Sequence, residues 1–321
     1  MSDKQALAGI DIGGTTIKFG LIDPRGKVIF KDQKPTVVGR GAEPLLHLVS
    51  NIAESLLYHA AEEELDVRWL GVGTPGAVEP RTGKIIGPSP NITGWEGTEL
   101  GGTLKKRINL PVFVDNDVNV MALAEARFGA AMNYKTAVCI AMGTGVGGGI
   151  VIDGKVLQGA SGGAGEIGHM VIDPNGPSCR CGSRGCLEAY CSSAAIISRA
   201  NQLLKNELTP VFQEVLEGKL ENMNIRRLFA AYKADDPVAR QVVTETAEYL
   251  GMGLANVVTL LNPEIVVIGG GIADGGGIVD EVTAVIKKRA LRPAGEVVRI
   301  VKASLGNDAG FIGASLLGDG R

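Results

Sequence analysis

The chain has 321 residues, of which 45% are hydrophobic and 21% charged, and its 32 basic and 35 acidic side chains give a net charge of −3. One hydrophobic core stops growing at roughly 250–300 residues, so we expect a globular protein of two lobes. The near balance of charge, without a long basic run, argues against nucleic-acid binding. No stretch approaches the ~20 apolar residues of a membrane span, and a strand pattern begins at once, so we expect a cytoplasmic protein.

The first half of the chain alternates between strands and helices, which is typical of an α/β sheet. The predicted elements are strands at 7–12, 16–23 and 27–31, a helix at about 43–64, an apolar run from residue 70 to 73, a weak helix at 97–108, a strand at 112–114 and a helix at 119–128.

The second half opens with a copy of the first pattern. GIDIGGTTIKFGLID at 9–23 aligns with CIAMGTGVGGGIVID at 139–153 at a constant offset of 130 residues. Each copy places a glycine turn between two apolar strands, which predicts a duplicated fold with one turn of each lobe facing a cleft. The later elements are predicted helices at about 192–206, 237–261, 277–290 and 308–318, and predicted strands at 265–268 and 297–301.

The two glycine turns are candidate phosphate-binding loops. Clustered glycine indicates backbone that approaches a ligand closely, and exposed backbone N–H groups can cradle phosphate oxygens. Neither turn has the spacing of a P-loop or of a dinucleotide-binding fingerprint, and an ordinary hairpin turn is the alternative for Gly13 and Gly14. Asp11 ends a buried strand, where an unpaired carboxylate is costly, so we expect magnesium to bind it.

Asp117 is the candidate general base. It lies between the predicted strand 112–114 and the predicted helix 119–128, and ligands of open α/β sheets bind at the carboxyl ends of the strands. Transfer of a phosphoryl group to an alcohol needs a carboxylate that accepts the hydroxyl proton. The alternative is that Asp117 is only a helix N-cap.

One histidine and three cysteines form a candidate zinc site. The pattern His-x9-Cys-x-Cys-x4-Cys comprises His169, Cys179, Cys181 and Cys186, and four such ligands form a tetrahedral structural site. The chain has only three histidines, which makes a chance arrangement improbable; reduced structural thiols with an incidental histidine are the alternative. Cys139 and Cys191 lie outside the pattern, and no disulfide is predicted.

Together these segments resemble the sugar kinase, Hsp70 and actin superfamily, and within it the ROK family of sugar kinases and repressors. The resemblance runs nearly end to end and rests on both glycine turns, on Asp115-Asn-Asp followed by Asn119-x-x-Ala-x-Ala-Glu, and on the segment from Glu166 to Glu188. It implies an α/β, two-lobed actin-like ATPase fold with a duplicated ribonuclease H-like core. The lobes would comprise residues 1–118 plus 307–321 and residues 119–306.

The resemblance also implies roles for individual residues. Asp117 would be the base and Asn116 would bind a sugar hydroxyl. The residues implied to contact the sugar are Gly76, Asn91, Asn116, Asp117, Glu166, His169 and Glu188, of which Gly76 and Asn91 could equally be turn residues. The residues implied to bind ATP or its magnesium are Asp11, Gly13, Gly14, Thr15, Thr16, Lys18, Gly143, Thr144, Gly145, Gly147, Gly269, Gly270 and Gly271.

We therefore expect an ATP-dependent hexose kinase of glycolysis that converts glucose to glucose 6-phosphate, because the run from Leu187 to Ser193 resembles bacterial glucokinases of the family. Kinases of N-acetylmannosamine or N-acetylglucosamine share these motifs and remain alternatives. Two alternatives are not sugar kinases. One is a sugar-responsive transcriptional regulator that lacks its DNA-binding module, since the first nucleotide motif starts at Asp11 and leaves no room for a helix-turn-helix. The other is an actin-like or Hsp70-like ATPase. The resemblance further suggests a homodimer or homotetramer.

Overall fold

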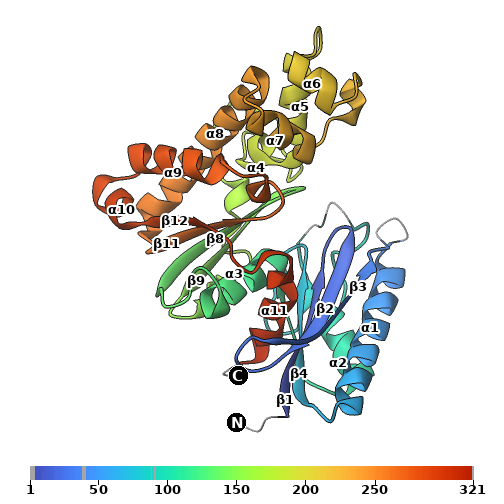
Figure 1. The fold of residues 1–321 in the computed structure, drawn as a ribbon. Coiled ribbons are helices and arrows are strands. Elements are labelled where there is room, and N and C mark those ends of the chain that lie inside the picture. The colour runs from blue at the N-terminus through green and yellow to red at the C-terminus, as the bar shows by residue number, and fades with distance from the viewer. Residues whose placement is uncertain (1–3, 38–40, 88, 90–91, 320–321) are drawn as a thin grey trace. The chain divides into compact units, whose positions relative to one another are not determined.

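The fold is taken from a computed structural model that describes residues 4–37, 41–87, 89 and 92–319 (Figure 1). The chain forms two compact units. The first contains residues 1–135, 149–165 and 304–321, and the second contains residues 136–148 and 166–303. The chain thus leaves the first unit and returns to it twice. The lobe boundary between residues 118 and 119 stays a prediction.

The first unit is built on a five-stranded sheet with the order β3-β2-β1-β4-β7. Its strands are β1 (Gln5–Ile12), β2 (Thr16–Ile22), β3 (Val28–Pro35), β4 (Asp66–Thr74) and β7 (Val112–Asn116). The first three strands, all predicted from the sequence, pair antiparallel in a meander, while β4 is parallel to both β1 and β7.

Helices cover both faces of this sheet. In Figure 1, α1 (Ala42–Glu62) and α2 (Leu100–Ile108) lie on one side of it, and α3 (Asp117–Phe128) and α11 (Ala309–Ser315) lie on the other. Side chains alternate along a strand, so Ala8 and Ile10 of β1 join the core under α1, whereas Gly9 faces α11. A Cβ at Gly9 would lie 1.9 Å from the Phe311 carbonyl oxygen, so only glycine lets α11 pack this closely.

The second sheet has the order β10-β9-β8-β11-β12. Its strands are β8 (Thr136–Met142), β9 (Val146–Ile152), β10 (Lys155–Val156), β11 (Ile265–Gly269) and β12 (Arg299–Lys302), and β11 is parallel to β8 and β12. The second unit contains the helices α4 (Glu188–Cys191), α5 (Ser193–Leu203), α6 (Pro210–Val215), α7 (Ile225–Lys233), α8 (Pro237–Leu261), α9 (Ile278–Arg289) and α10 (Arg292–Val297). The short remaining elements are β5 (Val78–Glu79), β6 (Lys84–Ile85), η2 (Ile167–His169), η3 (Leu220–Asn222), η4 (Ala273–Gly275), η5 (Gly306–Asp308) and η6 (Leu316–Gly318).

The predicted sequence repeat is confirmed as a repeat of structure. Strand β1 ends at Ile12 and β8 ends at Met142, while β2 begins at Thr16 and β9 begins at Val146. Both boundaries therefore keep the offset of 130 residues found in the sequence. Each hairpin turns over three residues, 13–15 in the first case and 143–145 in the second.

Other elements differ from the sequence prediction. The weak helix predicted from residue 97 begins at Leu100, because Gly94 and Gly97 adopt positive φ angles of 73° and 89° that a helix excludes. Residues 207–236, for which no element is predicted, contain α6 and α7, whose N-caps are Thr209 and Asn224. None of the helices in the described part of the chain is long and apolar enough to cross a membrane.

Candidate active site and metal centre

The candidate residues of the first unit lie at the carboxyl ends of its parallel strands. Asp11 of β1 pairs with Gly73 of β4, and Gly73 pairs in turn with Asp115 of β7. Asn116 follows and pairs with Thr74, and Asp117 begins α3 directly after it. The sheet register therefore brings Asp11 and the Asn116–Asp117 segment to one edge of the sheet, where ligands of α/β sheets bind.

Asp11 is a carboxylate in an unfavourable environment. Gly310 of α11 packs against it so closely that a Cβ there would lie 2.1 Å from Asp11 Oδ2. Burial, and then the charge of Asp117, raise the pKa of Asp11 to about 7, although the ammonium group of Lys18 opposes this rise. A divalent cation bound to Asp11 would compensate both effects, so the residues present fit the expected magnesium.

The N-cap of α3 is Asn116 and not Asp117. The Asn116 side chain accepts hydrogen bonds from Val118 N at 2.8 Å and Asn119 N at 3.3 Å. Its Nδ2 donates to the carbonyl oxygen of Gly76 at 3.3 Å, which joins two residues predicted to contact the sugar. Asp117 Oδ1 accepts from Val118 N at 2.9 Å. The N-cap role considered for Asp117 is thus filled by Asn116. Asn91, another predicted sugar contact, lies outside the described residues.

The first glycine turn is closed by its own backbone and by Thr36. Gly13 N donates to Thr16 O at 3.1 Å, and Thr36 donates from Oγ1 to Gly13 O at 2.8 Å and from its backbone N to Thr15 O at 2.9 Å. Thr36 was not found from the sequence, since it lies beyond both strands of the hairpin. Thr36 thus satisfies the carbonyl groups of Gly13 and Thr15.

The second glycine turn lies against a predicted sugar-binding carboxylate. Gly143 N donates to Gly145 O at 2.9 Å, and Ser193 Oγ donates to Gly143 O at 2.7 Å. A Cβ at Gly145 would lie 2.4 Å from Glu188 Oε2, and the same oxygen accepts from Val146 N at 3.0 Å. Glycine at position 145 is therefore required by the carboxylate of Glu188, a contact that the sequence pattern does not reveal.

Two acidic groups and one histidine of the second unit interact electrostatically. Glu166 precedes η2, which ends at His169, and Glu188 begins α4. Desolvation raises the pKa of Glu166, the imidazole of His169 opposes this rise, and the charge of Glu188 adds to it. These groups suit the hydroxyl groups of a polyol, because a carboxylate accepts hydrogen bonds from O–H groups and an imidazole N–H donates to a hydroxyl oxygen.

The predicted zinc ligands come together. The four ligand atoms of His169, Cys179, Cys181 and Cys186 all lie within 4.8 Å of one another. Cys181 Sγ and Cys186 Sγ are 3.7 Å apart, as are Cys179 Sγ and His169 Nδ1. A tetrahedral zinc ion with ordinary bond lengths would separate such pairs by about 3.6–3.8 Å, so the donor set fits zinc.

A bound zinc ion would stabilise the thiolate forms of these cysteines. Burial, and then the neighbouring Cys181 and Cys179, raise the pKa of the Cys186 thiol far above its ordinary value. Three thiolates at this spacing would repel one another without a bound metal ion. Cys139 and Cys191 are buried, and the five cysteines of the described chain are free thiols.

The third glycine group follows β11. Gly270 has a φ of 88°, and a Cβ there would lie 2.3 Å from the carbonyl oxygen of Met142. Gly271 has open space where a Cβ would be. The backbone at Gly271 is therefore accessible to a flat ligand, while the adenosine contact of residues 269–271 stays a prediction.

The sequence analysis also missed two buried polar contacts of the first unit. Trp95 is fully buried and donates from Nε1 to Thr74 Oγ1 at 2.9 Å, at the end of β4. Glu125 is fully buried too and accepts from Ala130 N, Ser304 N and Leu305 N at 2.7–2.9 Å. Thr74 and Trp95 are 21 residues apart and Glu125 and Ser304 are 179 apart, so no periodic pattern predicts these contacts.

The chain resembles known proteins along nearly its whole length. A family model described as ROK family matches residues 7–320. The glucokinase of Thermotoga maritima is 35% identical over 317 residues, which cover 97% of this chain and 96% of that protein. The xylose repressor of Caldicellulosiruptor bescii is 33% identical over 267 residues, which cover 83% of this chain and 66% of the repressor.

A solved structure has the same fold. The crystal structure of a ROK family glucokinase from Streptomyces griseus, in complex with glucose and AMPPNP, has a TM-score of 0.83 and 33% identity, covering 97% of this chain and 98% of that one. This likeness confirms the predicted two-lobed, actin-like α/β fold. From the family match, the relatives and the shared fold, it follows that this chain is a member of the ROK family.

Proposed function

We propose that the chain is an ATP-dependent hexose kinase and that glucose is its most favourable substrate. The observation that carries the proposal is the pair of carboxylates, Asp11 and Asp117, at the carboxyl ends of β1 and β7. Their interaction helps to raise the pKa of Asp11 to about 7, an arrangement that costs stability unless a cation and a reacting group use it. The glucokinases among the relatives support the hexose as acceptor.

In this proposal Asp117 accepts the proton of the attacking sugar hydroxyl. Its backbone position is fixed by the Asn116 cap, and its Oδ1 accepts a hydrogen bond from Val118 N at 2.9 Å. Asn116 Nδ2 binds the sugar together with the Gly76 segment. Asp11 would hold magnesium, which would neutralise charge on the transferred phosphoryl group.

The second unit would supply the sugar hydroxyl contacts. In the proposal, Glu166 and Glu188 accept hydrogen bonds from hydroxyl groups of the hexose, and His169 donates one to a hydroxyl oxygen. His169 directs Nδ1 towards Cys179 Sγ, so its Nε2 is the nitrogen left for the sugar. A zinc ion held by the four-ligand cluster would fix the tautomer and direction of this ring without taking part in phosphoryl transfer.

The nucleotide would contact glycine backbone. The turns at 13–15 and 143–145 would bind phosphate oxygens with backbone N–H groups, and the accessible backbone at Gly271 would lie along the adenosine. Lys18 Nζ donates to Asn307 O at 3.1 Å, close to the edge that carries Asp11, and would add positive charge for the phosphates.

The test is a panel of free hexoses assayed with magnesium and ATP. The purified chain should form a hexose phosphate from glucose faster than from N-acetylmannosamine or N-acetylglucosamine, and the Asp117→Asn variant should serve as the matched control. ATP turnover that is the same with and without every sugar would contradict the proposal and favour an actin-like ATPase. A preference for an N-acetylated sugar would retain the kinase and replace the substrate.

A sugar-responsive regulator is the second candidate, because the xylose repressor is similar over 83% of this chain. A regulator would bind sugar but would not need the base. If calorimetry with glucose gave the same affinity for the wild type and for Asp117→Asn, and neither protein formed sugar phosphate, the regulator would be the better assignment.

A further inference from the structure

Asp115 is a buried carboxylate that the proposed chemistry does not use. Its side chain is 3% exposed and accepts three hydrogen bonds. Asn116 N and Asn119 Nδ2 donate to Oδ1 at 2.7 and 2.8 Å, and Gln158 Nε2 donates to Oδ2 at 2.6 Å. None of the ion pairs in the described part of the chain includes Asp115, so neutral donors alone satisfy its charge.

The hydrogen-bond partners of Asp115 surround the proposed base. Asn116 and Asn119 lie on either side of Asp117 in the sequence, and both are fixed by one oxygen of Asp115. Asn119 keeps this bond although its own Oδ1 is buried without a hydrogen-bond partner in the described residues, which is a cost. The turn that carries Asp117 is therefore held by the hydrogen bonds to Asp115 as well as by the Asn116 cap.

Gln158 connects this turn to a second segment. It lies in the stretch between β10 and Glu166, a predicted sugar ligand, and belongs to the first unit together with Asp115. Gly162 of the same stretch packs so closely on the first unit that a Cβ there would lie 2.0 Å from Val78 O. The stretch is thus anchored at two points, and the Gln158 bond is the one that reaches the acceptor turn.

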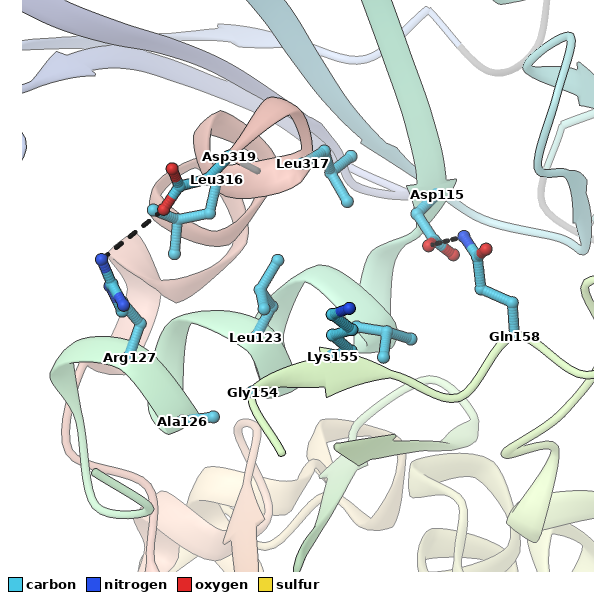
Figure 2. Close-up of a pocket in the computed structure, with 11 residues that line it drawn as sticks. Asp115, Leu123, Ala126, Arg127, Gly154, Lys155, Gln158, Leu316, Leu317 and Asp319 are labelled. Atoms are coloured by element: carbon cyan, nitrogen blue, oxygen red, sulfur yellow. Dashed lines mark hydrogen bonds and ion pairs between the residues drawn. The ribbon is translucent and has the colours of Figure 1, made fainter. Parts of the chain in front are cut away.

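Asp115 and Gln158 face each other at one end of a pocket of about 400 Å³, and the Arg127–Asp319 ion pair lies at its other end (Figure 2). Lys155, Leu123, Leu316 and Leu317 line the space between these two pairs. Because Gln158 borders this space, a substitution of Gln158 can be accommodated without overpacking a core.

We propose that Asp115 is a positioning residue for phosphoryl transfer, which holds the Asn116–Asp117 turn in place and, through Gln158, joins it to the segment leading to Glu166. The inference rests on the proposed function. Asp115 contacts neither reactant in it and acts through the placement of Asp117, where an error of about 1 Å can cost roughly 100-fold in rate.

The decisive experiment exchanges the two partners. Gln158→Glu places a second carboxylate against Asp115 and should lower kcat about 10- to 100-fold, with the KM for ATP within about 2-fold of wild type, because the glycine turns are untouched. Adding Asp115→Asn restores a carboxylate–amide pair with its sides exchanged. The double variant should therefore recover kcat to within about 3-fold of Asp115→Asn alone. Effects that multiply instead of showing rescue would overturn the proposal.

Lys155→Gln is the matched control, because it lines the same pocket and changes the net charge by the same amount. Its kcat should equal that of the wild type. A loss as large as that of Gln158→Glu would show that pocket charge, and not the Asp115–Gln158 bond, sets the rate, and would also overturn the proposal.

Hydrogen exchange of the amides of Asn116 to Asn119 provides a readout that does not depend on activity. Exchange should accelerate in Gln158→Glu and return towards the wild-type rate in the double variant. If the wild type phosphorylates no hexose, the proposed function is wrong. The exchange rates of these amides still test whether Asp115 and Gln158 hold the turn in place. Unchanged exchange in Gln158→Glu would reject that role whatever the activity.

Discussion

Replacing Asp11 by asparagine is expected to stabilise the folded chain at neutral pH and to abolish the proposed phosphoryl transfer. Burial, and then the charge of Asp117, raise the pKa of Asp11 to about 7. Asparagine has nearly the same shape without the charge, so it removes the cost of keeping an ionised carboxylate in this environment. It also removes the carboxylate proposed to bind magnesium.

The pKa gives the size and the sign of the stability change. Each tenfold change in proton affinity corresponds to about 1.4 kcal/mol, so a rise from 3.8 to about 7 corresponds to about 4 kcal/mol. In that pH interval the folded chain retains a proton that the unfolded chain has released, and stability falls as the pH rises. Asp11→Asn should therefore match the wild type near pH 4 and exceed its stability by up to about 4 kcal/mol above pH 7.

Urea unfolding in EDTA, followed by tryptophan fluorescence, measures this difference. Both tryptophans, Trp69 and Trp95, belong to the first unit, so the signal reports the unit that contains Asp11. Adding magnesium and ATP should reduce the advantage of the variant, because a ligand that binds the folded wild type stabilises it.

Asp23→Asn is the control of opposite sign. Although burial raises the pKa of Asp23, the backbone N–H groups of Lys27 and Arg25 hold it below its ordinary value. The stability that this carboxylate contributes is present above its unfolded pKa and is lost as the pH falls through its folded pKa, so Asp23→Asn should be less stable than the wild type at pH 8 and similar at pH 3. If Asp11→Asn were no more stable than the wild type at pH 8, or kept the same advantage at pH 4, the account of Asp11 would be wrong.

Four further predictions concern the two units separately. Asp117→Ala should lower turnover by roughly 10²–10⁴-fold with an unchanged circular dichroism spectrum, and near-normal turnover would exclude it as the base. Cys181→Ser should lower the zinc content below one ion per chain and raise the sugar KM, and a full complement of zinc would contradict the four-ligand site. Gly145→Ala should raise the sugar KM, because its Cβ would lie 2.4 Å from Glu188 Oε2, and an unchanged KM would argue against a sugar role for Glu188. Trp95→Phe should cost about 1 kcal/mol or more of stability through the lost bond to Thr74, as measured by urea unfolding.

The sequence predicted those features that depend on local pattern. The repeat at an offset of 130 residues located the turns of both hairpins, because strand alternation and a glycine turn are patterns of consecutive residues. The spacing of His169 and the cysteines likewise predicted a cluster that the fold brings together. In both cases the chain needs no distant partner to define the geometry.

Glycine shows where this reasoning stops. The clustered glycines indicate close approach of another group, but the sequence does not say which group approaches. At Gly145 it is the carboxylate of Glu188, at Gly9 the backbone of α11, and at Gly270 both a positive φ and the Met142 carbonyl. Among the glycines of the candidate loops, Gly143 and Gly271 both have open space where a Cβ would be, and these two leave room for a ligand.

The placement of Asp117 depends on contacts that no local pattern contains. Helix α3 begins beside Asp115, which binds Gln158 at a separation of 43 residues, and ends beyond Glu125, which binds Ser304 at a separation of 179. Both carboxylates are buried, so each would be costly if its distant partner were lost. Ser304 is also the residue at which the chain returns to the first unit. The helix that carries the proposed base is thus fixed at both ends by segments encoded much later, and substitution of Gln158 or Ser304 is expected to lower turnover although both lie far from Asp117 in the sequence.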